Sequence, residues 1–324
     1  MQRSDDPREL SPLFDAVAAR PDDDPPRQVL ADALLERGDA RGEFIQLQLL
    51  RARGLATAAQ QEREKHLLAH HWRKWLSEVP GISAKASLDF QRGFLRACAL
   101  QPCGVGVDSP TWRMIERLEV VNPQTPTELA APALTRLESL VGLDAASLAV
   151  VLAGPDKPRL RELGFAGPHM LADRARREQA QIAALTRFPS LRVLSLAPTP
   201  FRHHADWHEW LFASPVLPQL ERVRLWMELP FDVMGLHALL VRRGLPRLKL
   251  ELATMGVKLH LDVAWLTVQF DSEFWLGRHG QAMRNLAPNF APFPYRRFDV
   301  RVGDRAATPA ELERLGDVFR SHAA

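Results

Sequence analysis

The chain has 324 residues, which is enough for one large domain or two ordinary ones with a sizeable core. Hydrophobic residues make up 46% of it and charged residues 25%, as in soluble globular proteins, and the net charge of +3 is a weak argument for nucleic-acid binding. There is no apolar run of membrane-spanning length, no signal-peptide pattern, and only two cysteines, Cys98 and Cys103. We therefore exclude a membrane span and a disulfide scaffold, and expect a cytoplasmic protein without cofactors.

The first 80 residues predict a helical module. Apolar residues recur at helical spacing in "PRELSPLFDAVAAR", in "PPRQVLADALLERG" and in "ARGEFIQLQLLRARG". Asp24 is expected to cap the second helix, with Pro25 at its first position, and Gly38 to end it. Asp39 is then expected to cap the third helix. Most of the acidic residues between 22 and 43 are thereby explained as helix caps, turn residues or exposed positions.

Asp32 is less easily explained, because it falls close to the inner face of the second helix. We predict that Asp32 and Arg41 form a structural ion pair across the turn between the second and third helices. A catalytic acid is not favoured, since no second group with a complementary role is visible.

The stretch "LADALLERGDARGEFIQLQ" resembles the repeat-companion domain, a short module at the N-terminus of bacterial repeat proteins. The resemblance covers about residues 10 to 50. It departs at Leu30 and Ala33, where the family usually has Tyr and Trp. The resemblance implies no activity, but it implies that the same chain also contains repeats, often leucine-rich ones. The matching positions are Asp23, Asp24, Pro26, Arg27, Ala31, Asp32, Leu35, Glu36, Arg37, Gly38, Asp39, Arg41, Gly42, Glu43, Phe44 and Ile45.

A long helix over residues 56–79 and a strand-turn-strand over "LDFQRGFLRACAL" follow. His66 and His70 lie one helical turn apart, which is compatible with a metal site, but no third ligand is near. "HHWRKW" mixes basic and aromatic residues, as nucleic-acid-binding surfaces do. We favour an amphipathic helix that buries its tryptophans and leaves Arg73 and Lys74 in water.

After residue 110 an apolar pattern recurs at steps of 22 to 31 residues. The copies have apolar residues at their first, fourth and sixth positions, except for a weaker copy that keeps only the first two of these, as expected of a short strand with one buried face. Such strands must stack to bury that face, and the spacing lies at the long end of leucine-rich-repeat periods. The copies are Ile115/Leu118/Val120, Leu137/Leu140, Leu160/Leu163/Phe165, Leu191/Leu194/Leu196, Leu220/Val223/Leu225 and Leu245/Leu248/Leu250.

This region resembles leucine-rich repeats, but it departs from them after the strands, where Pro168, Thr199 and Glu228 replace the usual Asn. We expect an α/β protein with three parts. Residues 1–80 form the helical repeat-companion module, and 81–256 form an irregular leucine-rich-repeat-like solenoid with parallel strands. Residues 257–324 form a C-terminal cap of strands and one helix, which Thr308 and Glu311 start as a capping box.

No nucleotide-binding, nucleophile-elbow or zinc-protease motif occurs in the chain. We predict a non-enzymatic scaffold or adaptor that binds another protein through the outward strand residues, because Arg and Trp dominate binding hot spots. Two alternatives stay open: a nucleic-acid-binding accessory protein, and a metal-dependent enzyme at His204 and His208. The predicted partner-binding residues are Arg117, Glu119, Glu162, Ser195, Arg222, Arg224, Trp226 and Lys249.

Overall fold

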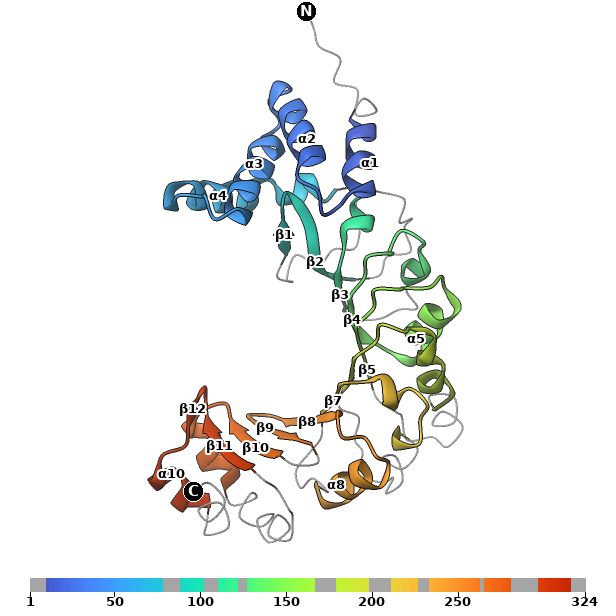
Figure 1. Ribbon diagram of the computed structural model, residues 1–324. Coiled ribbons are helices and arrows are strands. Elements are labelled where there is room, and N and C mark those ends of the chain that lie inside the picture. The colour runs from blue at the N-terminus through green and yellow to red at the C-terminus, as the bar shows by residue number, and fades with distance from the viewer. Residues whose placement is uncertain are drawn as a thin grey trace, which may run out of the picture. The chain divides into compact units, whose positions relative to one another are not determined.

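The computed structural model describes residues 10–77, 88–101, 110–121, 127–166, 179–197, 211–226, 233–262, 265–280 and 297–315 (Figure 1). Over these residues it is a mixed α/β structure with an N-terminal helical part and a 12-stranded sheet, whose strands follow one another in chain order. The chain divides into two compact units. The first, unit 1, is Met1–Leu140 with Ala153–Leu160, and the second, unit 2, is Val141–Leu152 with Arg161–Ala324.

Unit 1 begins with four helices: α1 (Ser11–Ala19), α2 (Pro25–Glu36), α3 (Ala40–Ala52) and α4 (Ala58–Trp75). Gly38 ends α2 in a left-handed conformation (φ 72°), and the amides of Gly38 and Asp39 bond back to Leu35 and Leu34. This is a Schellman motif. Asp39 then caps α3, because its Oδ1 accepts from the backbone N–H of Arg41 at 2.9 Å. Both predicted helix boundaries are confirmed.

Asp24 holds the predicted position before α2, but its side chain makes no capping hydrogen bond. Its backbone is helical (φ −79°, ψ −37°), whereas a side-chain cap needs an extended residue. The carboxylate instead pairs with Arg53, with Oδ2 at 2.9 Å from Nη2. The prediction of Asp24 as a side-chain cap is therefore wrong, and a long-range ion pair replaces it.

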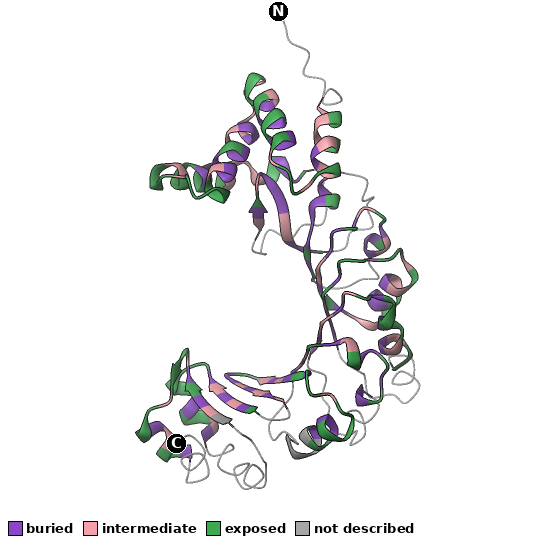
Figure 2. Ribbon diagram, in the orientation of Figure 1, coloured by how far each residue is buried: buried purple, intermediate pink, exposed green. Residues whose placement is uncertain are grey.

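The first three helices share one apolar core with a strand and a 3-10 helix that follow them, and their buried positions are purple in Figure 2. Its buried members are Val17, Leu30, Ala31, Leu34, Ile45, Leu49, Phe94 and Met114. They come from the inner faces of α1, α2 and α3, from β2 (Phe94–Leu100) and from the 3-10 helix η2 (Pro110–Met114). None of the described helices combines the length and the apolar character that a membrane crossing requires.

A tight hairpin joins β1 (Asp89–Gln91) to β2. Its two turn residues, Arg92 and Gly93, have φ of 51° and 87°, the left-handed pair that a two-residue hairpin needs. Gln48 of α3 makes two hydrogen bonds to the backbone of this hairpin. Its Oε1 accepts from the amide of Gly93 at 2.6 Å, and its Nε2 donates to the carbonyl of Phe90 at 3.1 Å. The buried amide thus joins the helical part to the sheet.

The predicted repeats all form strands. They are β3 (Arg117–Val120), β4 (Ser139–Leu143), β5 (Glu162–Ala166), β6 (Val193–Ala197), β7 (Arg222–Trp226) and β8 (Lys249–Thr254). Within unit 2, β5, β6, β7 and β8 pair in parallel. The shorter connecting elements are α5 (Ala145–Ala153), α8 (Val233–Arg242), η3 (Thr127–Ala130), η4 (Leu185–Arg187) and η5 (Leu217–Gln219).

The C-terminal strands extend the same sheet. β9 (Val257–Leu261) runs antiparallel to β8, β10 (Trp265–Phe270) antiparallel to β9, and β11 (Arg297–Val302) parallel to β10. The short β12 (Arg305–Ala306) pairs with β11. Helix α10 (Pro309–Leu315) follows the predicted capping box, in which Glu311 accepts from the amide and the hydroxyl of Thr308 at 2.7 and 2.9 Å.

Candidate functional site

The candidate site is one face of the sheet of unit 2, from β5 to β10. Along these strands buried residues alternate with partly exposed ones, which Figure 2 shows most clearly on β9 and β10. The inward row of Leu163, Leu194, Val223 and Leu250 is in register and fully buried. The residues between them therefore project from the opposite face, which we call the outward face.

The outward face carries mostly polar and aromatic residues. In one register row Ser195, Arg224, Glu251, His260 and Thr267 lie side by side on five neighbouring strands. In the next row Glu162 lies two strands from Arg222, which pairs with Lys249. Trp226 and Trp265 complete the set at strand ends.

Arg224 lies at the centre of this face and is held by two carboxylates. Its Nη1 donates to Oε1 of Glu162 on β5, and its Nε donates to Oε2 of Glu251 on β8 at 3.3 Å. The three side chains are between 19% and 37% exposed, so water weakens the attraction only in part. Arg224 is therefore fixed in orientation before any partner arrives, which lowers the entropy lost on binding.

The side chains of Arg222 and Lys249 differ from that of Arg224 in making no hydrogen bond or ion pair with any other described residue. They face each other on β7 and β8, and like charges directly opposite in a sheet disfavour each other. An acidic group placed between them would relieve this repulsion. Because no described carboxylate neutralises them, the positive charges of Arg222 and Lys249 are available to bind an anionic group of a ligand.

A groove of about 300 Å³ runs along the face beside these cations. Its lining side chains include Arg222, Lys249, His260 and Trp265. Partial burial lowers the pKa of His260, although the nearby Glu251 carboxylate acts in the opposite direction. His260 is therefore a neutral hydrogen-bonding group at pH 7, and the groove combines a neutral imidazole with two cations that have no ion pair among the described residues.

The aromatic residues of the face are unusually exposed. Trp226 is 44% exposed and Trp265 is 39% exposed, while Trp75 and Trp112 elsewhere are almost fully buried. Tryptophans that are exposed in a free protein are often buried when a partner binds, because they supply a large contact area with few rotatable bonds.

Six of the eight predicted binding residues thus come together on the outward face. Arg117 and Glu119 do not join them: both lie exposed on β3 in unit 1, where Arg117 pairs with Asp89. The residues that the sequence did not single out are Glu251, His260, Thr267 and Trp265. Three of them lie in the alternating stretch 257–270, but only the antiparallel register shows that they share this face.

Asp32 and Arg41 were predicted to pair with each other, but each contacts other residues in the structure. Asp32 is exposed, and its Oδ1 accepts from Nε2 of Gln46 at 3.0 Å. Arg41 is buried, and its guanidinium lies over the rings of Phe14 and Phe94 at 4.9 and 5.2 Å from their centroids. Among the described residues, Asp32 therefore has Gln46 as its partner, because α2 turns its carboxylate toward solvent.

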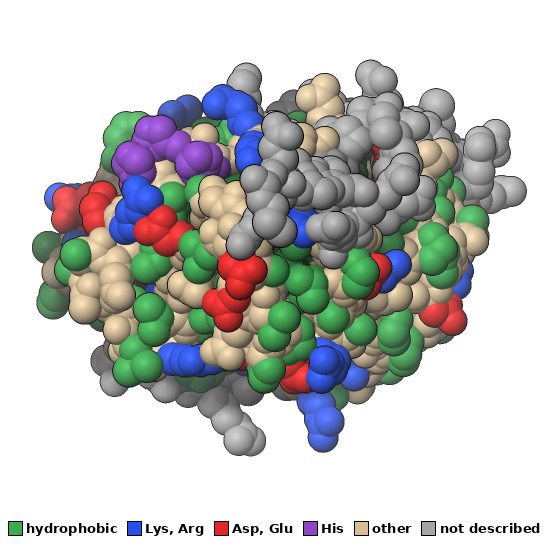
Figure 3. Space-filling model, turned by 90° about the horizontal axis from the view of Figure 1, so that it is seen from above, with side chains coloured by type: hydrophobic (Ala, Val, Ile, Leu, Met, Phe, Trp, Pro, Cys, Tyr) green, Lys and Arg blue, Asp and Glu red, His purple; other side chains and the backbone are tan. Residues whose placement is uncertain are grey.

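The two alternative functions were predicted from other residues. His204 and His208 fall outside the described residues. His66 and His70 stack with ring centroids 4.0 Å apart, and the described part of the chain contains no group of three or more potential metal ligands. Lys74 is 3.4 Å from Asp39, and Arg73 lies over Trp72. On the face in Figure 3 basic side chains are interspersed with acidic and hydrophobic ones.

Cys98 is a buried free thiol on β2, as expected of a reduced cysteine. Burial raises its pKa to about 12, so it is a packing residue and not a nucleophile at neutral pH. Cys103 lies outside the described residues. Compared with protein-family models, with curated proteins and with solved structures, the chain matches none of them.

Proposed function

We propose that the chain is a non-enzymatic adaptor that binds another protein on the outward face of β5 to β10. The observation that carries the proposal is a groove lined by the exposed Trp265 and by Arg222 and Lys249, whose side chains have no ion pair among the described residues, with the exposed Trp226 on the same face. Aromatic and arginine side chains supply most of the binding energy in protein interfaces. Arg224, fixed by Glu162 and Glu251, adds a preorganised anchor.

The proposed architecture is a repeat-companion module followed by a leucine-rich-repeat-like solenoid. It is supported by the parallel order of β5 to β8 and by the buried leucines that recur in register on each strand. In such arrays one sheet face is open along several strands, which suits an extended surface of a partner protein. The partner is expected to present carboxylates toward Arg222 and Lys249.

The test is affinity capture from a lysate of the native organism, followed by mass spectrometry. The full chain is compared with the triple variant Arg222→Ala, Trp226→Ala, Lys249→Ala. These side chains are partly or largely exposed, so the variant is expected to fold. Nuclease treatment of the lysate separates a protein partner from one bridged by nucleic acid.

The matched control is Phe274→Ala. Phe274 is 65% exposed in unit 2, but it does not line the groove. We expect a protein captured by the native chain and by the control variant, after nuclease treatment, to be lost with the triple variant. Equal capture by all three would contradict the assignment of the outward face, and capture that nuclease abolishes would favour the nucleic-acid alternative.

A further inference from the structure

A second cavity, in unit 1, has five arginines among its lining residues. Its volume is about 320 Å³, and it lies against the start of α2, the β1–β2 hairpin and the start of β3. We call it the arginine pocket. Its charged lining residues are Arg27, Arg92, Arg96, Arg136 and Arg159, with Asp22, Glu116 and Glu138. Five cations against three carboxylates leave an excess of two positive charges around one small cavity.

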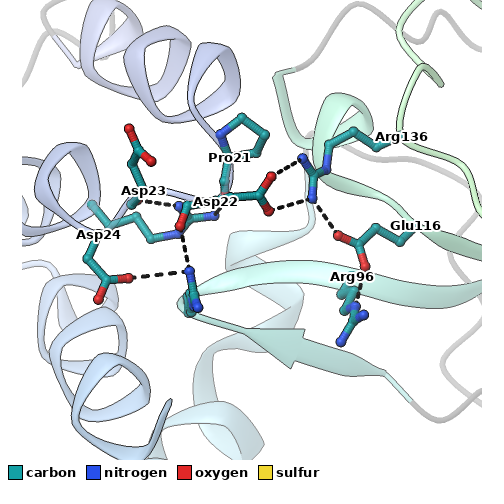
Figure 4. Close-up of polar contacts among 9 residues, drawn as sticks. Pro21, Asp22, Asp23, Asp24, Arg96, Glu116 and Arg136 are labelled. Carbon is teal, nitrogen blue, oxygen red and sulfur yellow. Dashed lines mark hydrogen bonds and ion pairs between the residues drawn. The ribbon is translucent and has the colours of Figure 1, made fainter. Parts of the chain in front are cut away.

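Part of this charge is accounted for by internal ion pairs (Figure 4). Arg136 donates to both carboxylate oxygens of Asp22, at 2.9 and 3.2 Å, and to Oε1 of Glu116 at 2.7 Å. Arg96 donates to the other oxygen of Glu116. These contacts lower the pKa values of Asp22 and Glu116 despite the opposing effect of burial. Both acids are therefore ionised at neutral pH, and they compensate Arg136 and Arg96.

Of the other three arginines, Arg27 and Arg159 make no ion pair with a described carboxylate, and Arg92 makes only a long one. Arg27 is only 2% exposed, yet its guanidinium bonds to two backbone carbonyls, those of Asp23 and Pro21. Arg92 donates to the carbonyl of Asp22 at 2.7 Å, and its nearest carboxylate oxygen, on Asp24, is 3.5 Å away. Arg159 is exposed at the rim and makes no hydrogen bond or ion pair with another described residue.

Buried donors without partners also lie around the pocket. The Nε–H groups of Arg27, Arg92 and Arg136 are all inaccessible to water and have no hydrogen-bond acceptor in the described part of the chain. A buried unsatisfied donor is costly, and native proteins rarely leave several together without a ligand or water to satisfy them. Burial, and secondarily the charge of Arg92, lowers the pKa of Arg27 to about 10. An added anion would stabilise this desolvated cation.

We propose that the arginine pocket binds a small molecule through a phosphate dianion. The charge excess of two matches a dianion, and the flat guanidinium groups match the bidentate geometry of phosphate oxygens. Asp22 has a particular place in this site. The Asp22 side chain is 71% exposed, while the side chain of its ion-pair partner, Arg136, is 10% exposed. Asp22 therefore lies at the mouth of the pocket as an internal anion that competes for Arg136.

The test is calorimetric titration of the full chain with inorganic phosphate, against sodium chloride at matched ionic strength and against acetate. We expect saturable 1:1 binding with a dissociation constant of about 1 mM or tighter. Arg159→Ala and Arg92→Asn should each weaken it by about tenfold, because each removes one charge-assisted contact. Asn is chosen at position 92 because it tolerates the left-handed backbone of this turn.

Two further variants make the result specific. Asp22→Asn should tighten phosphate binding severalfold, since it removes the competing carboxylate and frees Arg136. If the ion pairs had only a structural role, this substitution would not increase the affinity for phosphate. Arg63→Ala is the control, because Arg63 pairs with Glu43 on the helices and does not line the pocket. The proposal is overturned by a lack of saturable phosphate binding, by acetate binding as tightly, or by Arg159→Ala and Asp22→Asn leaving the affinity unchanged.

Discussion

Two glycines of unit 1 allow the packing of the β1–β2 turn to be measured apart from its backbone strain. Gly38 and Gly93 both have positive φ, 72° and 87°. A β-carbon added at Gly38 would meet no atom within 4 Å, whereas one added at Gly93 would lie 2.2 Å from Cγ1 and 2.9 Å from Cβ of Ile45. Ile45 is fully buried in the core, so it has little room to move away.

The expected magnitudes follow from these two environments. Gly38→Ala should lower the free energy of unfolding by about 1–2 kcal/mol, the cost of a left-handed conformation for an L residue. Gly93→Ala carries the same cost and a further ~1–3 kcal/mol for overpacking against Ile45. Both substitutions reduce the entropy of the unfolded chain equally, so this contribution cancels in their difference.

The assay is equilibrium unfolding in urea, followed by tryptophan fluorescence, on the native chain and both variants. The difference between Gly93→Ala and Gly38→Ala is the quantity of interest. A difference of about 1–3 kcal/mol supports a tight contact between the turn and α3. If the two variants agree within about 0.5 kcal/mol, the turn does not pack on Ile45 as described, and the reasoning is refuted.

Three other predictions concern single side chains. Gln48→Leu leaves the Gly93 amide and the Phe90 carbonyl without their buried partner, and should lower the free energy of unfolding by about 2–4 kcal/mol in the same urea assay. The bond to Arg305 is the main reason that the pKa of Glu311 falls from 4.5 to about 2, so this carboxylate stabilises the fold above pH 4.5 and loses that effect as the pH falls toward 2. Glu311→Gln should therefore flatten the stability profile in that window, and an unchanged profile would contradict the pair. Cys98 should resist iodoacetamide at pH 8 in a Cys103→Ser background until the chain is unfolded, whereas rapid native-state alkylation would show that it is accessible.

The positions of the helices and strands were predictable from local patterns. Gly38 and Asp39 mark a helix end and a helix start because the backbone conformations they favour are intrinsic to these residue types. The six apolar repeats mark strands because a side chain two residues further on returns to the same face. Neither inference needs knowledge of a distant residue.

The partners of charged side chains were not predictable in the same way. Asp24 pairs with Arg53, which is 29 residues away in the sequence, and Arg224 pairs with Glu162, which is 62 residues away. Nothing in the neighbouring sequence distinguishes these partners from other charged residues. The pairs depend on strand register and helix packing, which only the folded chain defines. For this reason the arginine pocket, built from separate segments, had no sequence signal apart from its arginines.

The sheet order of unit 2 also has a consequence for how this part of the chain folds. From β5 to β9 each strand pairs only with its predecessor and its successor in the chain. Strand pairing can then spread from one neighbour to the next without closing a loop longer than one strand-to-strand connection, which keeps the entropic barrier of each step low. With the same connectivity, one strand and its connection could be added or removed without rethreading the rest of the sheet.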